Sequence, residues 1–93
     1  MTVKLYNIDE TRYLFSIGQV IEKLSESKGK TNIERLAYEC KISKTYFYKI
    51  LYGETNTTIL VLRRIAKELG VDISTFLIMV NDFYQKSIPP IDN

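Results

Sequence analysis

Several residue types are scarce or missing in this sequence. It has no histidine and no tryptophan, one cysteine and two prolines among 93 residues. A single cysteine excludes an intramolecular disulfide, and without histidine the chain lacks the usual general base and a credible set of zinc ligands. We therefore expect neither a metal ion nor another cofactor.

Long apolar runs are missing as well. The longest, Phe76 to Val80, is far shorter than the roughly 20 residues that a membrane-spanning helix needs. No basic segment followed by an apolar one opens the chain, as in a secretory signal. Glycine-rich phosphate loops and a nucleophile beside a base are absent too, so an enzyme is the least favoured class. We expect a cytoplasmic protein that does not bind membranes.

Charge is distributed unevenly along the chain. The net charge is only +2, but residues 28–53 carry six cations and two acids, a balance of +4, and the remainder carries seven cations and nine acids, a balance of −2. Such a concentration of positive charge suits a surface that faces phosphates. An ordinary solvated face explains the charge alone equally well, so the argument depends on the geometry of this segment.

The segment 31–53 has the pattern of two short helices joined by a tight turn. Thr31 and Glu34 have the spacing of a capping box, with Asn32 as the alternative cap. Apolar residues then recur at helical spacing over residues 32–40, which predicts one buried stripe made of Ile33, Leu36, Ala37 and Cys40. Cys40 is expected to be a small buried hydrophobe.

The second helix is predicted over residues 44–52, with Ser43 as its N-cap and Gly53 at its end. Its inner stripe is Phe47, Ile50 and Leu51, and its outward face carries Thr45, Tyr48, Lys49 and Tyr52, with Lys44 projecting from the first turn. Lysine donates to guanine O6 and N7, and threonine offers a hydroxyl and a methyl group. This set favours a DNA major groove over an enzyme active site.

Three further helices complete an all-α chain. They are predicted over residues 9–28, capped by Asp9, over residues 59–69, capped by Thr58, and over residues 73–84, opened by Asp72 or Ser74. Gly29 and Gly70 end the first two of them. This divides the chain into an N-terminal arm 1–8, one helical domain 9–84 and a tail 85–93, which Pro89 and Pro90 keep extended.

The last helix has more apolar residues than one buried stripe accommodates. The surplus predicts an apolar patch and a twofold dimer contact, made by Phe76, Ile78, Met79, Val80, Phe83 and Tyr84. The alternative is that the long first helix or the N-terminal arm covers this surplus within one chain.

The order of these motifs resembles the helix-turn-helix family of phage repressors and Cro proteins. The resemblance is carried by L-A at Leu36, I-S at Ile42, the Tyr46-Phe47 and Ile50 spacing, Gly53, and R-R-I-A-K-E-L-G-V from Arg63 to Val71. It covers roughly residues 17–77 and implies a compact five-helix, lambda-repressor-like DNA-binding domain whose second and third helices form the helix-turn-helix. One departure is Lys41, which stands where the family usually has glycine. A left-handed lysine costs about 1 kcal/mol unless the turn avoids that conformation.

The resemblance also implies roles for individual residues. Lys44, Thr45 and Lys49 match the positions that reach base edges, and Asn32 matches the position where the first motif helix meets the DNA backbone. Tyr48 and Tyr52 are expected at thymine methyls or phosphates, and Tyr46 as a half-buried residue whose hydroxyl reaches a phosphate. Asn56 lies in the loop that runs near the backbone in this family, although an ordinary surface loop accounts for it equally well.

The leading functional prediction is a transcriptional repressor or Cro-like switch that binds a roughly palindromic double-stranded DNA operator as a homodimer. An antitoxin with the same domain is a close variant. The alternative from another class is a protein-interaction module, such as an antirepressor or polymerase adaptor, in which Tyr46, Tyr48 and Tyr52 and the apolar last helix contact a protein partner.

Overall fold

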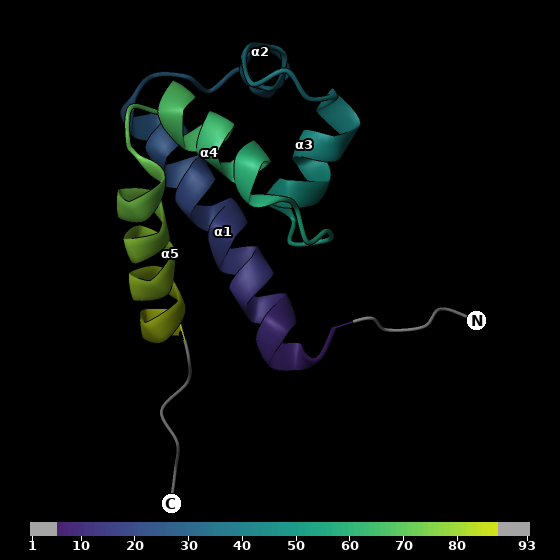
Figure 1. Cartoon of the computed structure of the whole chain (residues 1–93), viewed down its shortest axis with the longest axis vertical. Coiled ribbons are helices and arrows are strands. Elements are labelled where there is room, and N and C mark those ends of the chain that lie inside the picture. The colour runs from purple at the N-terminus through teal and green to yellow at the C-terminus, as the bar shows by residue number, and fades with distance from the viewer. Residues whose placement is uncertain (1–5, 88–93) are drawn as a thin grey trace, which may run out of the picture.

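A computed structural model of the chain describes residues 6–87. These residues form five α-helices and no strand (Figure 1), which confirms the predicted all-α class. The helices are α1 (Ile8–Ser27), α2 (Ile33–Glu39), α3 (Lys44–Leu51), α4 (Ile59–Glu68) and α5 (Ile73–Ser87). Most of the predicted N-terminal arm and C-terminal tail, residues 1–5 and 88–93, lies outside the described residues.

Side-chain caps set where the later helices begin. The Ser43 hydroxyl accepts from the amide of Tyr46 at 3.1 Å and the Thr58 hydroxyl from the amide of Val61 at 3.2 Å, as expected of N-cap residues. At the start of α5 the Asp72 carboxylate accepts from the amide of Thr75 at 2.7 Å, so Asp72 and not Ser74 opens this helix. The same hydrogen bond lowers the pKa of Asp72.

Two predicted helix ends were wrong, those at the start of α1 and the end of α5, and the cap of α2, left open between Thr31 and Asn32, is now decided. α1 begins one residue early because Asn7 caps it in place of Asp9, in a reciprocal capping box with Glu10. α2 is capped by Asn32, whose side chain accepts from the amide of Arg35 at 3.1 Å, so the alternative cap replaces the Thr31 box. α5 continues to Ser87 because no glycine or proline interrupts it there.

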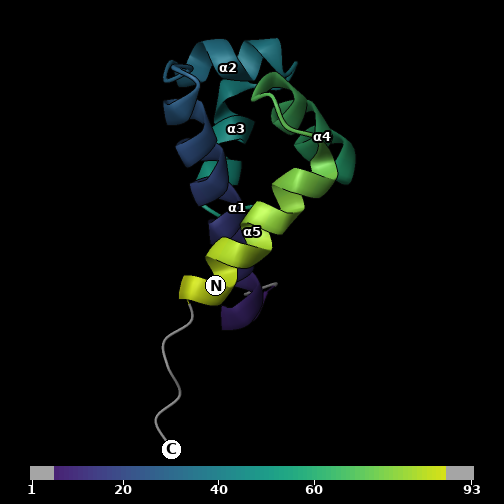
Figure 2. The same ribbon diagram turned by 90° about the vertical axis from the view of Figure 1, so that its left-hand side faces the viewer.

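The long helix α1 is the centre of the arrangement. α5 packs along one side of it and α3 packs against another, and the turned view shows α4 and α5 diverging from their connecting turn (Figures 1 and 2). Apolar side chains from all five helices fill the space between them. The buried core consists of Leu14, Ile17, Val20, Ile21, Leu24, Leu36, Ala37, Cys40, Phe47, Ile50, Leu51, Leu62, Ile65, Ala66, Leu69, Phe76 and Val80.

The backbones of α1 and α3 come unusually close together. A Cβ atom added at Gly18 would lie 2.0 Å from the Leu51 carbonyl oxygen, and one added at Gly53 would lie 2.8 Å from the Phe15 amide nitrogen. Gly53 also has a φ of +70°, the left-handed conformation expected where a helix ends. The C-terminal end of α3 therefore rests directly on the backbone of α1, and only glycine fits at the contact.

The turn between α2 and α3 requires a left-handed residue. Lys41 has a φ of +62°, and it is the one non-glycine residue with positive φ among residues 6–87. The amide of Ile42 then donates to the Ala37 carbonyl at 3.1 Å, which closes the turn. The conformation common in the family is thus kept without its glycine, at a cost of about 1 kcal/mol.

Replacing Gly18 by alanine is expected to lower the free energy of unfolding by about 3 kcal/mol, because the new methyl group must displace backbone atoms of α3. Gly29→Ala is the control, since Gly29 has a φ of +69° and no atom within 4 Å of an added Cβ. It should lose only about 1 kcal/mol, the cost of the left-handed backbone. Urea denaturation followed by circular dichroism measures both, and equal losses would contradict the close contact.

Lys41→Gly should raise the free energy of unfolding by about 0.5 kcal/mol. The left-handed penalty disappears, and part of the gain is offset by the greater freedom of glycine in the unfolded chain. The control Lys49→Gly, inside α3, should instead lower it by about 1 kcal/mol. A decrease for both variants in the same denaturation experiment would argue against strain at Lys41.

Candidate nucleic-acid interface

Helices α2 and α3 and the turn between them form the candidate interface. α2 buries Leu36 and Ala37, and α3 buries Phe47, Ile50 and Leu51, so each short helix is held to the core by one face. α3 lies on the opposite side of the molecule from α5 in Figure 1, and Figure 2, viewed from the side of α5, shows α3 farther back. The outer face of α3 is consequently not covered by the remaining helices.

The side chains predicted to reach base edges lie on this outer face. Lys44, Thr45 and Lys49 are all exposed. The Lys44 ammonium is 3.1 Å from a carboxylate oxygen of Glu34, a residue in the first turn of α2. Within residues 6–87 Lys49 takes part in no ion pair, so its charge is free to meet a phosphate or a base edge.

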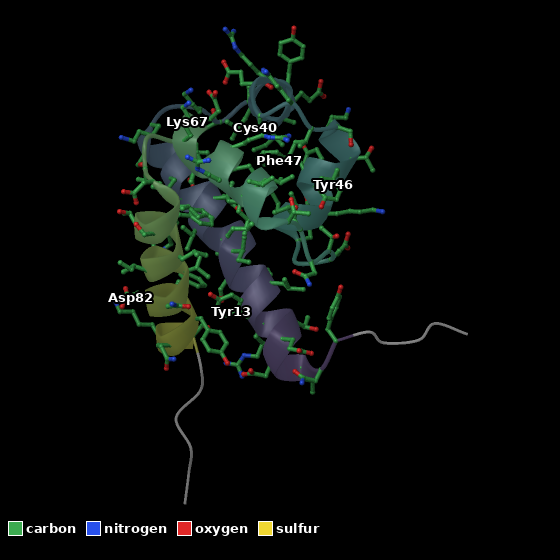
Figure 3. All side chains as sticks on the ribbon, in the orientation of Figure 1. Tyr13, Cys40, Tyr46, Phe47, Lys67 and Asp82 are labelled. Carbon is green, nitrogen blue, oxygen red and sulfur yellow. The ribbon has the colours of Figure 1, made fainter. Side chains whose placement is uncertain are left out.

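The tyrosines of α3 are less available than predicted. Tyr46, labelled in Figure 3, is half-buried, as expected. Its hydroxyl is hydrogen-bonded to the Thr57 hydroxyl at 2.7 Å. The hydroxyl predicted to reach a phosphate thus ties α3 to the following loop.

Tyr48 was assigned to the outward face, and this was wrong, because its side chain is half-buried against the core. Its ring stacks on that of Tyr52, with 5.9 Å between the ring centroids. Both rings line a hollow of about 370 Å³ that also includes Glu22 and Glu26 of α1. Tyr52 remains 60% exposed, so it keeps a surface that a partner molecule can contact.

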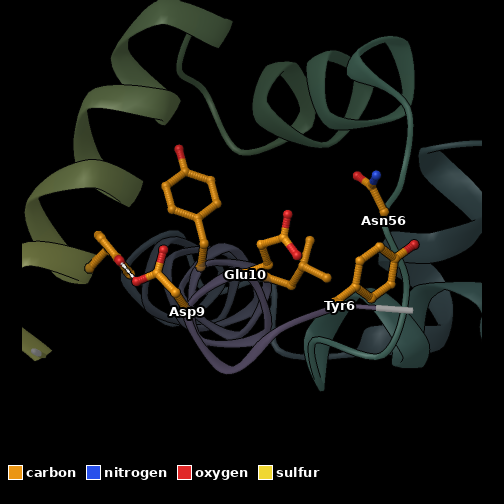
Figure 4. Close-up of a pocket in the computed structure, with 7 residues that line it drawn as sticks. Tyr6, Asp9, Glu10 and Asn56 are labelled. Carbon is orange, nitrogen blue, oxygen red and sulfur yellow. Dashed lines mark hydrogen bonds between the residues drawn. The ribbon is translucent and has the colours of Figure 1, made fainter. Parts of the chain in front are cut away.

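The two asparagines predicted to meet the DNA backbone have different surroundings. Asn32 is exposed at the start of α2, where its side-chain oxygen is used in the cap and its side-chain amide nitrogen makes no hydrogen bond within residues 6–87. Asn56 lines a hollow of about 310 Å³ together with Asp9 and Glu10 (Figure 4). The negative charge of these carboxylates disfavours a phosphate beside Asn56.

The same hollow contains an interaction between α1 and α5. The Tyr84 hydroxyl donates to the Asp9 carboxylate, and this hydrogen bond raises the pKa of Tyr84. The ring of Tyr84 packs edge-on against Tyr13 with 5.4 Å between centroids. Tyr84 was predicted at a dimer interface, but these contacts show that it connects two helices of one chain.

Two other predicted interface residues of α5 are corrected. Phe76 and Val80 are 0% exposed, because α1 covers the inner face of α5, and neither side chain can contact a second copy. For Phe76 and Val80, the alternative expectation therefore holds, that the first helix covers the apolar residues of the last helix within one chain. Phe83 and Met79 are half-buried, and the Lys23 ammonium lies 5.3 Å from the centre of the Phe83 ring. Ile78 is 67% exposed and is the main apolar residue on the outer face of α5.

Sequence reasoning missed Glu34 and Thr57 as residues that position the interface. Glu34 was assigned to a capping box, and Thr57 was given no role in positioning the second motif helix. Glu34 contacts Lys44 of α3, which lies ten positions later in the chain. Thr57 contacts Tyr46 of α3, which lies eleven positions earlier. Helical periodicity relates residues three or four apart, so no sequence pattern indicated these pairs.

The thiol of Cys40 is buried, as predicted for a small hydrophobe. Burial raises its pKa to about 11, and the charges of Glu68 and Glu39 add to this effect. No group of three potential ligands that could hold a metal ion occurs among residues 6–87. In the same range, no helix has both the length and the hydropathy needed to cross a bilayer.

A short helix, a turn with one left-handed residue and a second short helix with an exposed basic face together define a helix-turn-helix DNA-binding domain. Over 60 residues the chain is 37% identical to control protein C.BamHI of Bacillus amyloliquefaciens, covering 64% of this chain and 72% of the relative. The chain belongs to the same family of helix-turn-helix transcriptional regulators. This relative is a control protein, so the narrower resemblance to phage repressors and Cro proteins stays a prediction.

The solved structure of the clp gene regulator ClgR from Corynebacterium glutamicum has the same fold. It superposes with a TM-score of 0.73 over 80% of this chain and 78% of ClgR, at 18% sequence identity. No protein-family model matches the chain. The relative C.BamHI is named as a control protein and not as an enzyme, which points away from catalysis.

Proposed function

We propose that the chain is a repressor or Cro-like switch that places α3 in the major groove of a roughly palindromic operator. The proposal rests on the different surroundings of the two faces of α3. One face is fixed against α1 through Gly18 and Gly53, and the other displays Lys44, Thr45 and Lys49 to solvent. A rigid, exposed basic helix of this kind suits base recognition.

The contacts with DNA follow from the position of each side chain. Lys44, Thr45 and Lys49 are proposed to contact base edges, and the free amide of Asn32 a phosphate. Tyr52 remains a candidate for a thymine methyl. The remaining three residues are proposed to support the interface without contacting DNA directly. The Tyr46 hydroxyl is hydrogen-bonded to Thr57, Tyr48 is half-buried, and Asn56 lies beside two carboxylates.

Dimerisation is proposed through the outer face of α5, centred on Ile78. An exposed isoleucine on a helix whose other apolar residues are buried or half-buried favours a small, symmetric contact between two copies. In such a dimer the two α3 helices should be about 34 Å apart, one turn of DNA, to enter successive major grooves on one face.

The second candidate, a protein-interaction module, is favoured by one observation. Tyr38 and Tyr52 are 82% and 60% exposed, which is unusual for large aromatic side chains without a partner. An antirepressor, a polymerase adaptor and an antitoxin would each use such a surface. Retention on DNA-cellulose that is lost at moderate salt separates DNA binding from this alternative.

The double variant Lys44→Ala, Lys49→Ala should weaken operator binding at least about 30-fold, since each lysine that contacts a base contributes about 1–3 kcal/mol. The control Arg63→Ala, Lys67→Ala removes the same charge from the exposed face of α4 and should change binding only slightly. Fluorescence anisotropy with an operator selected from a random DNA pool measures both variants. Unchanged binding by the first variant, with its circular dichroism intact, would refute the placement of α3 in the groove.

Ile78→Glu should give a folded monomer, because it introduces charge at an exposed position of the proposed contact. Its control is Tyr38→Glu, which introduces the same charge at an exposed aromatic residue of α2 and should leave the dimer intact. Sedimentation equilibrium gives the mass of each variant. A monomeric parent chain, or an Ile78→Glu variant that still dimerises, would contradict the assignment of the interface to α5.

A further inference from the structure

The contact between Glu34 and Lys44 joins the two helices of the helix-turn-helix on their outer side. The carboxylate and the ammonium are 3.1 Å apart, with 69% and 55% of the two side chains exposed. Glu39, the other acid of α2, is directed elsewhere and approaches Lys30 and Arg35 at 3.8 and 3.7 Å. Of these two acids, only Glu34 stands beside a lysine of α3.

An exposed ion pair of this kind contributes at most about 1 kcal/mol to stability, so DNA can separate or reorient it at little cost. Helix capping does not require Glu34 either, because Asn32 supplies the cap of α2. The carboxylate nevertheless lies where DNA is proposed to bind, and its charge is of the wrong sign for the phosphate backbone. Since neither stability nor capping explains a carboxylate at this position, we look for a role of Glu34 in DNA recognition.

The carboxylate affects the two possible partners of Lys44 differently. A phosphate that approaches the Lys44 ammonium also approaches Glu34 and is repelled by it. The edge of a base pair carries no net charge and is not repelled in this way. Glu34 therefore directs Lys44 away from the backbone and towards base edges.

The two side chains also match the two bases of one pair. A lysine ammonium donates to guanine O6 and N7, whereas a carboxylate accepts from the N4 amino group of cytosine. We propose that Glu34 and Lys44 act together to recognise a G·C base pair in each half-site, with Glu34 as a specificity-determining residue. This inference rests on the proposed function, because it concerns the same DNA interface.

The test compares Glu34→Gln with the parent chain on two duplexes, the selected operator and a non-operator sequence of equal length. Glutamine keeps the size of the side chain and removes its charge. We expect binding to non-operator DNA to become several-fold tighter, and the ratio of operator to non-operator affinity to fall about tenfold. Sites selected by the variant should lose the preference for G·C at one position of each half-site.

Glu39→Gln is the matched control, since it removes the same charge from the same helix without touching Lys44. It should leave the affinity ratio and the selected sequence unchanged. If Glu34→Gln tightens binding to both duplexes by the same factor and selects the same sites as the parent chain, the carboxylate acts only through general electrostatics and the inference is overturned. If the parent chain selects no DNA sequence at all, the proposed function itself fails, and that result differs from the first.

Discussion

The close contact between the backbones of α1 and α3 is the constraint on which the interface depends. Gly18 lets the Leu51 carbonyl approach α1, and Gly53 both ends α3 and fits against the backbone at Phe15. Because no side chain separates the two helices there, α3 has little freedom to tilt or slide. A short helix of eight residues would be marginal alone in water, so this contact and the buried Phe47 and Ile50 keep its outer face in a fixed orientation.

The outer surface of the molecule shows how charge is divided between stability and recognition. The ion pairs of Lys30 with Glu39 and Glu68 connect α2 and α4, and the pair of Lys86 with Asp82 lies within α5. Lys44 and Lys49 remain on the outer side of α3, with Glu34 beside the first of them. The excess of positive charge in residues 28–53 therefore includes exposed lysines on the face of α3 that is proposed to bind DNA.

The covering of α5 by α1 changes what the apolar composition of the last helix means. A surplus of apolar residues in one helix indicates either a partner or a long neighbouring helix, and the pattern alone does not distinguish them. Here the early start of α1 at Ile8 extends it alongside α5, where Tyr13 and Tyr84 pack together. Phe76 and Val80 are consequently core residues, and the exposed apolar surface of α5 is reduced mainly to Ile78.

The sequence by itself determined the five helices, the caps at Ser43 and Thr58, the glycine at the end of α3 and its buried stripe, because these depend on contacts within a few residues. Only the tertiary structure decided that Tyr48 is half-buried against the core, that the Tyr46 hydroxyl is hydrogen-bonded to Thr57, and that Glu34 meets Lys44. These contacts join residues on different helices or loops, and their geometry depends on the angle between α2 and α3 and on the close approach of α3 to α1. No local pattern encodes those two quantities.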